Sequence, residues 1–218
     1  RKIDAANRIA DELLSFGLVP EVLEPFPGRG SVVCRVRGDG SGGGPLLILS
    51  HLDVVPPEIP LRRTDGGVRG RGACDAKGQI AAQLAAIELL LDRGVAGLAW
   101  LGVCGEETDS AGAAGIAGAA GARFASLRAI INGEPTGCVL AAGQKGFLRV
   151  RLTCEGKAAH GATPELGDNA LLALTDWIGA VRRAEGASDP ELGAEAWNLG
   201  IMSGGRAANV VPDRAEAE

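Results

Sequence analysis

The first part of the chain alternates between short apolar runs and segments whose apolar residues recur at helical spacing. The segments 1–18 and 80–91 place apolar residues three or four positions apart, which predicts amphipathic helices ending near Gly17 and Gly94. Further elements are expected as strands at 31–40, 44–50, 98–104 and 127–131, the last two buried, and a helix of small residues at about 110–121. Strands that alternate with helices predict an α/β fold with a mixed, mostly parallel sheet flanked by helices.

The pattern changes near Gly143, where alternating apolar and polar residues replace the continuous apolar runs. The elements expected after this point are a half-exposed antiparallel strand at 147–156, an amphipathic helix at 168–183, and strands at 197–205 and 209–218. We therefore expect two domains, 1–143 and a smaller α+β domain over 144–218. The second domain is expected to be incomplete, because the sequence stops within a predicted strand.

Composition and charge exclude several classes of partner. The net charge is −5, and no basic stripe of the kind that nucleic-acid binding needs is present. No apolar run approaches the roughly 18 residues of a membrane span. Five scattered cysteines without a CxxC pair indicate free thiols in a reducing compartment, so we expect a cytoplasmic protein without nucleic-acid or membrane partners.

Polar residues follow each of the apolar runs that predict parallel strands. These residues are His51 and Asp53 after 44–50, Glu106 and Glu107 after 98–104, and Glu134 after 127–131, with Asp75 just before the helix at 80–91. In open α/β sheets ligands bind outside the carboxyl ends of the strands, so these side chains should converge. Converging carboxylates repel one another unless a cation lies among them. Histidine with Asp or Glu is a donor set for Zn²⁺, Mn²⁺ or Co²⁺, which predicts a metal site.

Each of these residues also has an ordinary interpretation. A histidine after a strand is usually a loop residue, paired glutamates after a glycine usually form a solvated turn, and Asp75 fits a helix N-terminus. The Gly-rich segment 40–44 precedes a strand and is interpreted as a loop, not a phosphate cradle. The recurrence of acidic residues at successive strand ends favours the metal site over these separate explanations.

Six motifs, in order, make the resemblance specific. They are SHLDVVP, GRGACDAKGQ, GEET, NGEPT, GKAAHGATPE and GGRAANVVP, which run from about 46 to 213. The chain resembles the acetylornithine deacetylase, succinyl-diaminopimelate desuccinylase, aminoacylase and carboxypeptidase G family of co-catalytic zinc hydrolases. The resemblance implies a zinc-peptidase-like catalytic domain with an inserted ferredoxin-like lid, through which the protein forms a homodimer.

The resemblance also implies the roles of the site residues. Two Zn²⁺ ions, for which Co²⁺ or Mn²⁺ could substitute, would be held by His51 and Glu134 on one ion, Glu107 on the other and Asp75 between them. Glu106 would be the general base that activates water, and the carboxylate of Asp53 would accept the other ring N–H of His51. A cis peptide would join Asp75 to Ala76.

Three residues of the second domain receive roles by the same resemblance. His160 would stabilise the oxyanion in the partner subunit's site, and Asn209, with Gly205 before it, would contact substrate. The family takes one more metal-binding histidine from near its C-terminus, but His51 and His160 are the two histidines of this chain. We therefore expect a truncated chain that is inactive or very weakly active alone.

The expected reaction is hydrolysis of the amide bond of a small N-acyl amino acid, acetyl or succinyl, by a metal-activated water. A dipeptidase or carboxypeptidase of the same family is the alternative. A non-catalytic metal-binding or dimerisation fragment is the alternative of another class.

Overall fold

The computed structural model describes residues 2–36, 44–120, 126–184 and 186–218. The chain forms two compact units, Arg1–Val139 and Leu140–Glu218, which we call the N-terminal and C-terminal units. The domain boundary predicted between 143 and 144 lies close to this division. The Gly-rich loop expected at 40–44 falls almost entirely outside the described residues.

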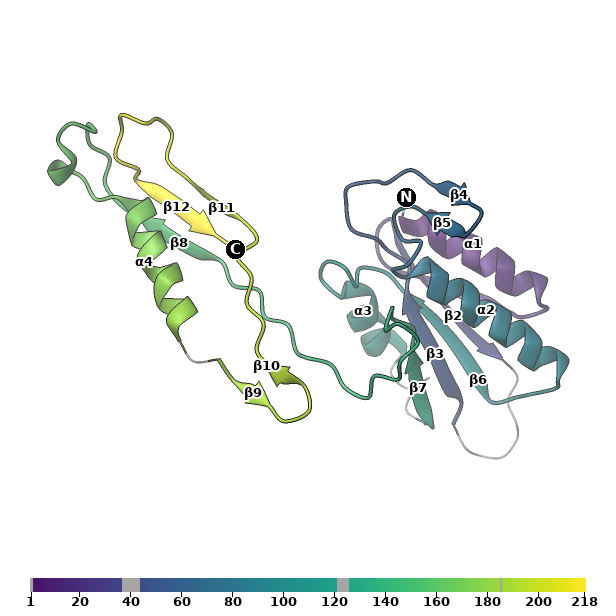
Figure 1. The fold of residues 1–218 in the computed structure, drawn as a ribbon. Helices are drawn as coiled ribbons and strands as arrows, with labels where there is room; N and C mark the ends of the chain where they lie inside the picture. Colours follow the sequence, from purple (N-terminus) through teal and green to yellow (C-terminus); the bar gives the residue numbers. More distant parts are fainter. Residues whose placement is uncertain (1, 37–43, 121–125, 185) are drawn as a thin grey trace. The chain divides into compact units, whose positions relative to one another are not determined.

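A mixed five-stranded sheet forms the centre of the N-terminal unit, with strand order β1-β2-β6-β3-β7 (Figure 1). Its strands are β1 (Pro20–Phe26), β2 (Arg29–Val36), β3 (Leu46–His51), β6 (Leu98–Val103) and β7 (Ala129–Asn132). Strand β3 runs parallel to both β6 and β7, whereas β2 is antiparallel to β1 and β6. The predicted mixed sheet is confirmed, with its antiparallel pairs on the β1 side.

Helices cover both faces of this sheet. They are α1 (Lys2–Ser15), α2 (Lys77–Asp92) and α3 (Ala111–Ala120). Apolar residues of α1 and α2 share one buried cluster with the sheet, and Ile116 of α3 belongs to a second cluster that contains Leu47 and Leu101. Because neighbouring residues of β3 and β6 enter different clusters, both strands need apolar residues at consecutive positions, as the sequence pattern indicated.

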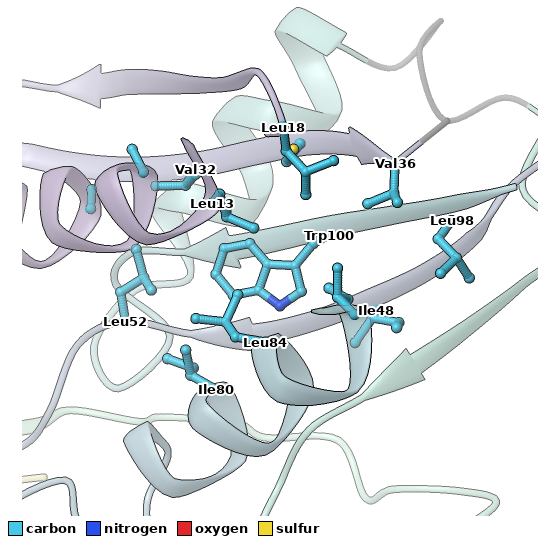
Figure 2. Close-up of a cluster of buried hydrophobic side chains, with 14 residues drawn as sticks. Leu13, Leu18, Val32, Val36, Ile48, Leu52, Ile80, Leu84, Leu98 and Trp100 are labelled. Atoms are coloured by element: carbon cyan, nitrogen blue, oxygen red, sulfur yellow. The ribbon is translucent and has the colours of Figure 1, made fainter. Parts of the chain in front are cut away.

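Trp100 lies at the centre of the first cluster, between Leu84 of α2 and Leu13 of α1 (Figure 2). Its side chain is fully buried, and its indole N–H donates to Oε1 of Gln83 at 2.9 Å. A buried indole normally finds a polar partner, and in this fold the partner comes from the helix that packs on the sheet. This contact fixes α2 against β6.

Strand β7 differs from the sequence-based expectation. The run 127–131 was expected to be buried, but Ile130 and Ile131 are 56% and 52% exposed. The reason is the position of β7 at an edge of the described sheet, where it pairs with β3 alone. Apolar sequence therefore predicted the strand correctly and its burial wrongly.

The sequence pattern did not predict β1 or a hairpin of the N-terminal unit. Strand β1 contains two prolines and alternates weakly, and Pro20 opens it at the outer edge of the sheet, where a missing N–H is tolerated. The hairpin of β4 (Arg62–Thr64) and β5 (Gly67–Arg69) is exposed along its length and carries no apolar run. Neither element offers the periodicity on which the predictions depended.

The C-terminal unit is a three-stranded antiparallel sheet, β11-β12-β8, covered by one helix. Its main elements are β8 (Leu152–Glu155), α4 (Ala170–Arg183), β11 (Met202–Gly204) and β12 (Arg214–Ala217), with a short hairpin of β9 (Ser188–Asp189) and β10 (Gly193–Ala194). Asn169 caps α4 by accepting the N–H groups of Leu171 and Leu172 at 3.0 and 3.2 Å. Each strand is shorter than its predicted segment. No described helix has the length and apolar character needed to cross a membrane.

Candidate metal centre

The parallel strands bring the predicted ligands to one edge of the sheet. Strand β3 ends at His51, β6 ends two residues before Gly105, and β7 ends at Asn132, two residues before Glu134. The parallel pairing of β3 with β6 and β7 places these three carboxyl ends side by side. Asp75 reaches the same place from the segment before α2. Residues that are far apart in sequence therefore meet because the topology aligns the strand ends.

His51, Asp75 and Glu134 form a compact group of donors. His51 Nε2 lies 2.8 Å from Asp75 Oδ1 and 4.0 Å from Glu134 Oε2. The three ligand atoms all lie within 4.8 Å of one another. The imidazole is 2% exposed, whereas Asp75 is exposed and Glu134 is partly exposed, so the group opens toward solvent on its acidic side. The peptide bond between Asp75 and Ala76 is cis, as predicted.

The second nitrogen of His51 contacts Asp53, but through a different atom from the one expected. Nδ1 lies 3.1 Å from the main-chain oxygen of Asp53 and 3.9 Å from its carboxylate. The carboxylate instead accepts the N–H groups of Gly105 and Glu106 at 2.9 and 3.2 Å. These N–H groups lie just beyond β6 and attract the buried anion away from the ring. The main-chain oxygen of Asp53 thus orients the ring of His51, and its carboxylate holds the backbone at Gly105 and Glu106.

Electrostatics favour a cation in this group. Burial raises the pKa of Glu134, and the charges of Glu106, Asp75 and Glu107 raise it further against the attraction of His51. Burial also raises the pKa of Glu107, helped by the charge of Asp75. For His51, burial lowers the pKa, but the hydrogen bond to Asp75 and the surrounding carboxylates outweigh it and raise the pKa. Mutual repulsion among carboxylates is relieved by a bound cation.

The donor chemistry fits a divalent transition metal. An imidazole nitrogen and carboxylate oxygens are ligands for Zn²⁺, Mn²⁺ and Co²⁺. Glu107 is not part of the compact three-residue group, although its pKa responds to Asp75 and His51. The predicted ligands on the first ion, His51 and Glu134, lie together with the predicted bridging residue Asp75. The roles of Glu106 and Glu107 stay predictions.

Two supporting residues were missed by sequence analysis. Gln83 of α2 donates from Nε2 to the main-chain oxygen of Leu49 at 2.9 Å, and Ser50 Oγ donates to the oxygen of Gly133 at 2.9 Å. The Gln83 bond joins α2 to the end of β3, and the Ser50 bond joins the end of β3 to the residue after β7. One sequence feature could have indicated Gln83. It is a polar residue next to Leu84, which belongs to the apolar face of the predicted helix, so its side chain could be expected to need a buried hydrogen-bond partner.

Arg29, the first residue of β2, was also missed. Its guanidinium forms a bidentate pair with Asp109, which follows the predicted ligand Glu107 in the chain. The pair, strengthened by the N–H of Ala111, holds the pKa of Asp109 far below its usual range. The same hydrogen bonds raise the pKa of Arg29. An arginine at the start of a strand carries no sequence signal of this contact.

The three site residues predicted for the second domain belong to the C-terminal unit. His160 and Asn209 lie side by side: the N–H of Gly161 donates to the oxygen of Asn209 at 2.8 Å, and His160 forms a β-bridge with Val210. The N–H of Ala162 donates to His160 Nδ1 at 3.1 Å, which leaves Nε2 of this exposed ring available. Gly205, with φ +73°, directly follows β11. Their roles in substrate binding and catalysis stay predictions.

A cavity of about 610 Å³ lies between α1 and α2. Its wall includes the apolar side chains of Ile9, Phe16, Ile80, Leu84 and Leu52. None of the predicted metal ligands lines it. The cavity is therefore separate from the metal chemistry, which belongs to the strand ends.

Comparison with known proteins adds the family context. Residues 47–198 match the sequence profile of peptidase family M20/M25/M40. A probable carboxypeptidase from Aspergillus terreus is 40% identical over 193 residues, which cover 82% of this chain and 45% of the relative. The chain thus spans about half the length of the curated relatives it matches.

Solved structures show the same fold at lower sequence identity. A dipeptidase from Saccharomyces cerevisiae is 15% identical with a TM-score of 0.67, over 98% of this chain and 62% of that one. A metallo-carboxypeptidase from Sulfolobus solfataricus is 16% identical with a TM-score of 0.62, over 99% of this chain and 65% of that one.

Proposed function

This chain belongs to peptidase family M20/M25/M40, and we propose that its protein is a metal-dependent hydrolase that cleaves an amide bond. The observation that carries the proposal is the donor group of His51, Asp75 and Glu134, whose ligand atoms lie within 4.8 Å of one another. Structural zinc sites are usually rich in cysteine, whereas imidazole with carboxylates is typical of catalytic sites. The donor set therefore supports catalysis over a purely structural ion.

We propose Zn²⁺ as the natural metal, in two copies, with Co²⁺ or Mn²⁺ as substitutes. His51 and Glu134 would hold one ion, and Glu107 would hold the other. Asp75 would be a ligand of both ions. When bound, such ions lower the pKa of water and polarise a carbonyl group, which removes the need for a Ser or Cys nucleophile.

The protein's own residues then orient the reactants and move one proton. Glu106 accepts a proton from the attacking water and delivers it to the leaving amine, so one carboxylate serves as base and then as acid. Two features of the chain support this role. The side chain of Glu106 is exposed at the strand ends, and its N–H is held at 3.2 Å by Asp53, which limits where the carboxylate can lie.

Two substrate classes share this chemistry. Several curated relatives are probable carboxypeptidases, which favours a peptide whose last residue carries a free carboxylate. The ordered motifs from SHLDVVP to GGRAANVVP also resemble deacetylases and desuccinylases, which favours an N-acetyl or N-succinyl amino acid. In both cases the scissile amide lies on the amino side of an amino-acid residue, so we propose that group as the common element of the substrate.

Removal of metal from the full natural protein should abolish hydrolysis. Dialysis against a chelator is expected to lower kcat/KM by more than about 100-fold, because the hydrolytic water then has its ordinary high pKa. Readdition of Zn²⁺, Co²⁺ or Mn²⁺ to separate samples ranks the metals. A panel of N-acetylornithine, N-acetyllysine, N-succinyl-diaminopimelate and dipeptides, with free or blocked amino groups, separates the substrate classes by kcat/KM.

Two results would contradict the proposal. Hydrolysis that survives complete metal removal would exclude the metal-dependent mechanism. A protein that binds no metal and cleaves no amide of the panel would support the non-catalytic alternative.

We also propose that the protein forms a homodimer through the C-terminal unit, so that each copy places His160 in the site of the other. The outer surface of α4 supports this, because Trp177 and Val181, one turn apart, are 62% and 40% exposed. Exposed aromatic side chains of this kind are enriched in interfaces.

Trp177→Glu should convert the dimer to a monomer in sedimentation velocity, because a charge would be buried at the interface. Leu166→Glu is the control, since Leu166 is 63% exposed but lies on the turn before α4. A Trp177→Glu protein that stays dimeric would place the interface elsewhere.

A further inference from the structure

The segment that carries Glu106 and Glu107 is anchored at its start by Asp53. The carboxylate oxygen Oδ1 of Asp53 accepts the N–H of Gly105 at 2.9 Å and the N–H of Glu106 at 3.2 Å. Asp53 is 5% exposed, so these bonds are sheltered from water. This anchor alone leaves the other end of the segment unconstrained.

Arg29 supplies the second anchor, beyond Glu107. Its Nη1 donates to Asp109 Oδ2 at 2.8 Å, and its Nη2 donates to Asp109 Oδ1 at 2.7 Å and to Thr108 Oγ1 at 3.1 Å. The two parallel bonds to one carboxylate are the fork geometry in which arginine binds most specifically. Glu106 and Glu107 are therefore the two residues between the anchors.

Arg29 is itself held rigidly. It is the first residue of β2, which pairs with β6 in a register that matches Val32 with Gly102. Continuing this register to the start of β2 places Arg29 opposite Gly105. Its guanidinium also lies 5.9 Å from the centre of the Phe26 ring, and its side chain is 22% exposed. The anchor is thus part of the sheet and not a mobile surface side chain.

The turn between the anchors has no spare room. Gly105 has φ +79°, and a Cβ there would collide with Arg29 Nη2 and come within 2.9 Å of Asp109 Oδ1. The oxygen of Gly105 accepts the N–H groups of Asp109 at 3.1 Å and Ser110 at 2.7 Å. A shift of Asp109 would therefore be passed to the backbone at Gly105 and to the glutamate beside it.

We propose that Arg29 is a positioning residue for hydrolysis, acting through Thr108 and Asp109 to fix the carboxylates of Glu106 and Glu107. The inference rests on the proposed function for the role of those two glutamates. The side-chain partners of Arg29 described above are Phe26, Thr108 and Asp109, and none of these is a predicted metal ligand. The effect of Arg29 is expected to be large because a displacement of about 1 Å in a catalytic group can lower a rate by about 100-fold.

Arg29→Gln in the full natural protein should lower kcat by about 10- to 100-fold, with KM changed much less. The same substitution should weaken Co²⁺ binding in a titration followed by the absorption spectrum of the bound ion, because Glu107 loses its position. The Asp109 side chain is 53% exposed, and ion pairs open to solvent on one side contribute little to stability, so the melting temperature should stay close to that of the unchanged protein. Arg8→Gln is the matched control, since Arg8 forms an exposed ion pair with Glu12 within α1.

Two further variants test whether the effect passes through the ion pair. Asp109→Asn should reproduce the loss of kcat, and the double variant with Arg29→Gln should be little worse than either single variant, because both remove the same contact. Arg29→Lys should restore only part of kcat, since an ammonium keeps the charge but not the fork. Full recovery by lysine, or additive losses in the double variant, would overturn the proposal.

The metal titration keeps this proposal distinct from the proposed function. If the unchanged protein cleaves no amide, the proposed function fails, and the anchor is judged by whether Arg29→Gln and Asp109→Asn weaken Co²⁺ binding. If the protein is active, and Arg29→Gln retains both kcat and Co²⁺ affinity, the anchor is refuted while the function stands. An unfolded Arg29→Gln protein leaves Asp109→Asn to decide.

Discussion

Glu106→Gln is expected to lower kcat by about 10²- to 10⁴-fold while the protein retains its metal. Glutamine keeps the length of the side chain and the N–H that Asp53 accepts, so the segment should stay in place. It cannot accept the proton of the attacking water, and that step is the one expected to fail. Steady-state kinetics and metal content by elemental analysis measure the two halves of this prediction on one sample.

The neighbouring glutamate provides the sharpest control. Glu107→Gln should weaken metal binding, because this residue is the proposed ligand, and its activity should recover in part at high metal concentration. Glu106→Gln should not recover. If the two variants exchange these behaviours, the proposed base and ligand are assigned in the wrong order.

His51→Ala should lower metal affinity by more than about 100-fold, because even loss of a residue that only supports a ligand lowers affinity by about 10- to 100-fold. The imidazole is 2% exposed and is held by Asp53 and Asp75, so no other side chain of the described group can replace its nitrogen. Calorimetric titration with Zn²⁺ measures the loss directly. Turnover should fall with it at all but very high metal concentrations.

The second histidine of the chain serves as the control for this experiment. His160 belongs to the C-terminal unit, and His160→Ala should leave metal affinity unchanged even if turnover falls. Equal metal affinity of His51→Ala and the unchanged protein would refute the donor group of His51, Asp75 and Glu134.

The sequence carried enough information for the main strands and for the gathering of the ligands. Continuous apolar runs identified β3 and β6, and a polar residue after each strand pointed to the edge where the structure places His51 near Asp75 and Glu134. The signal was strong because burial on both faces demands consecutive apolar residues. The same reasoning gave the wrong burial for β7, because an apolar strand at the edge of the described sheet has the same sequence pattern as a buried strand.

Side-chain contacts across the sheet could not be predicted in this way. The pairing of Arg29 with Asp109 depends on the register of β2 with β6, which no local pattern specifies. The family resemblance implied that the carboxylate of Asp53 contacts the ring of His51, but this carboxylate accepts the N–H groups of Gly105 and Glu106 instead. The hydrogen-bond donors of a buried carboxylate depend on the tertiary structure, so they cannot be predicted from the sequence pattern alone.

The strand order β2-β6-β3-β7 also has a consequence for folding. His51 at the end of β3 and Glu134 just beyond β7 come together only after β3 has paired with β7, which follows it at long sequence separation. Pairings of this kind raise the contact order and form late, so a partly folded chain would hold these donors apart. Metal would then bind the native state in preference to the unfolded chain and stabilise it by mass action in proportion to the logarithm of its free concentration. The supply of metal would thus influence how long the protein survives as well as how fast it works.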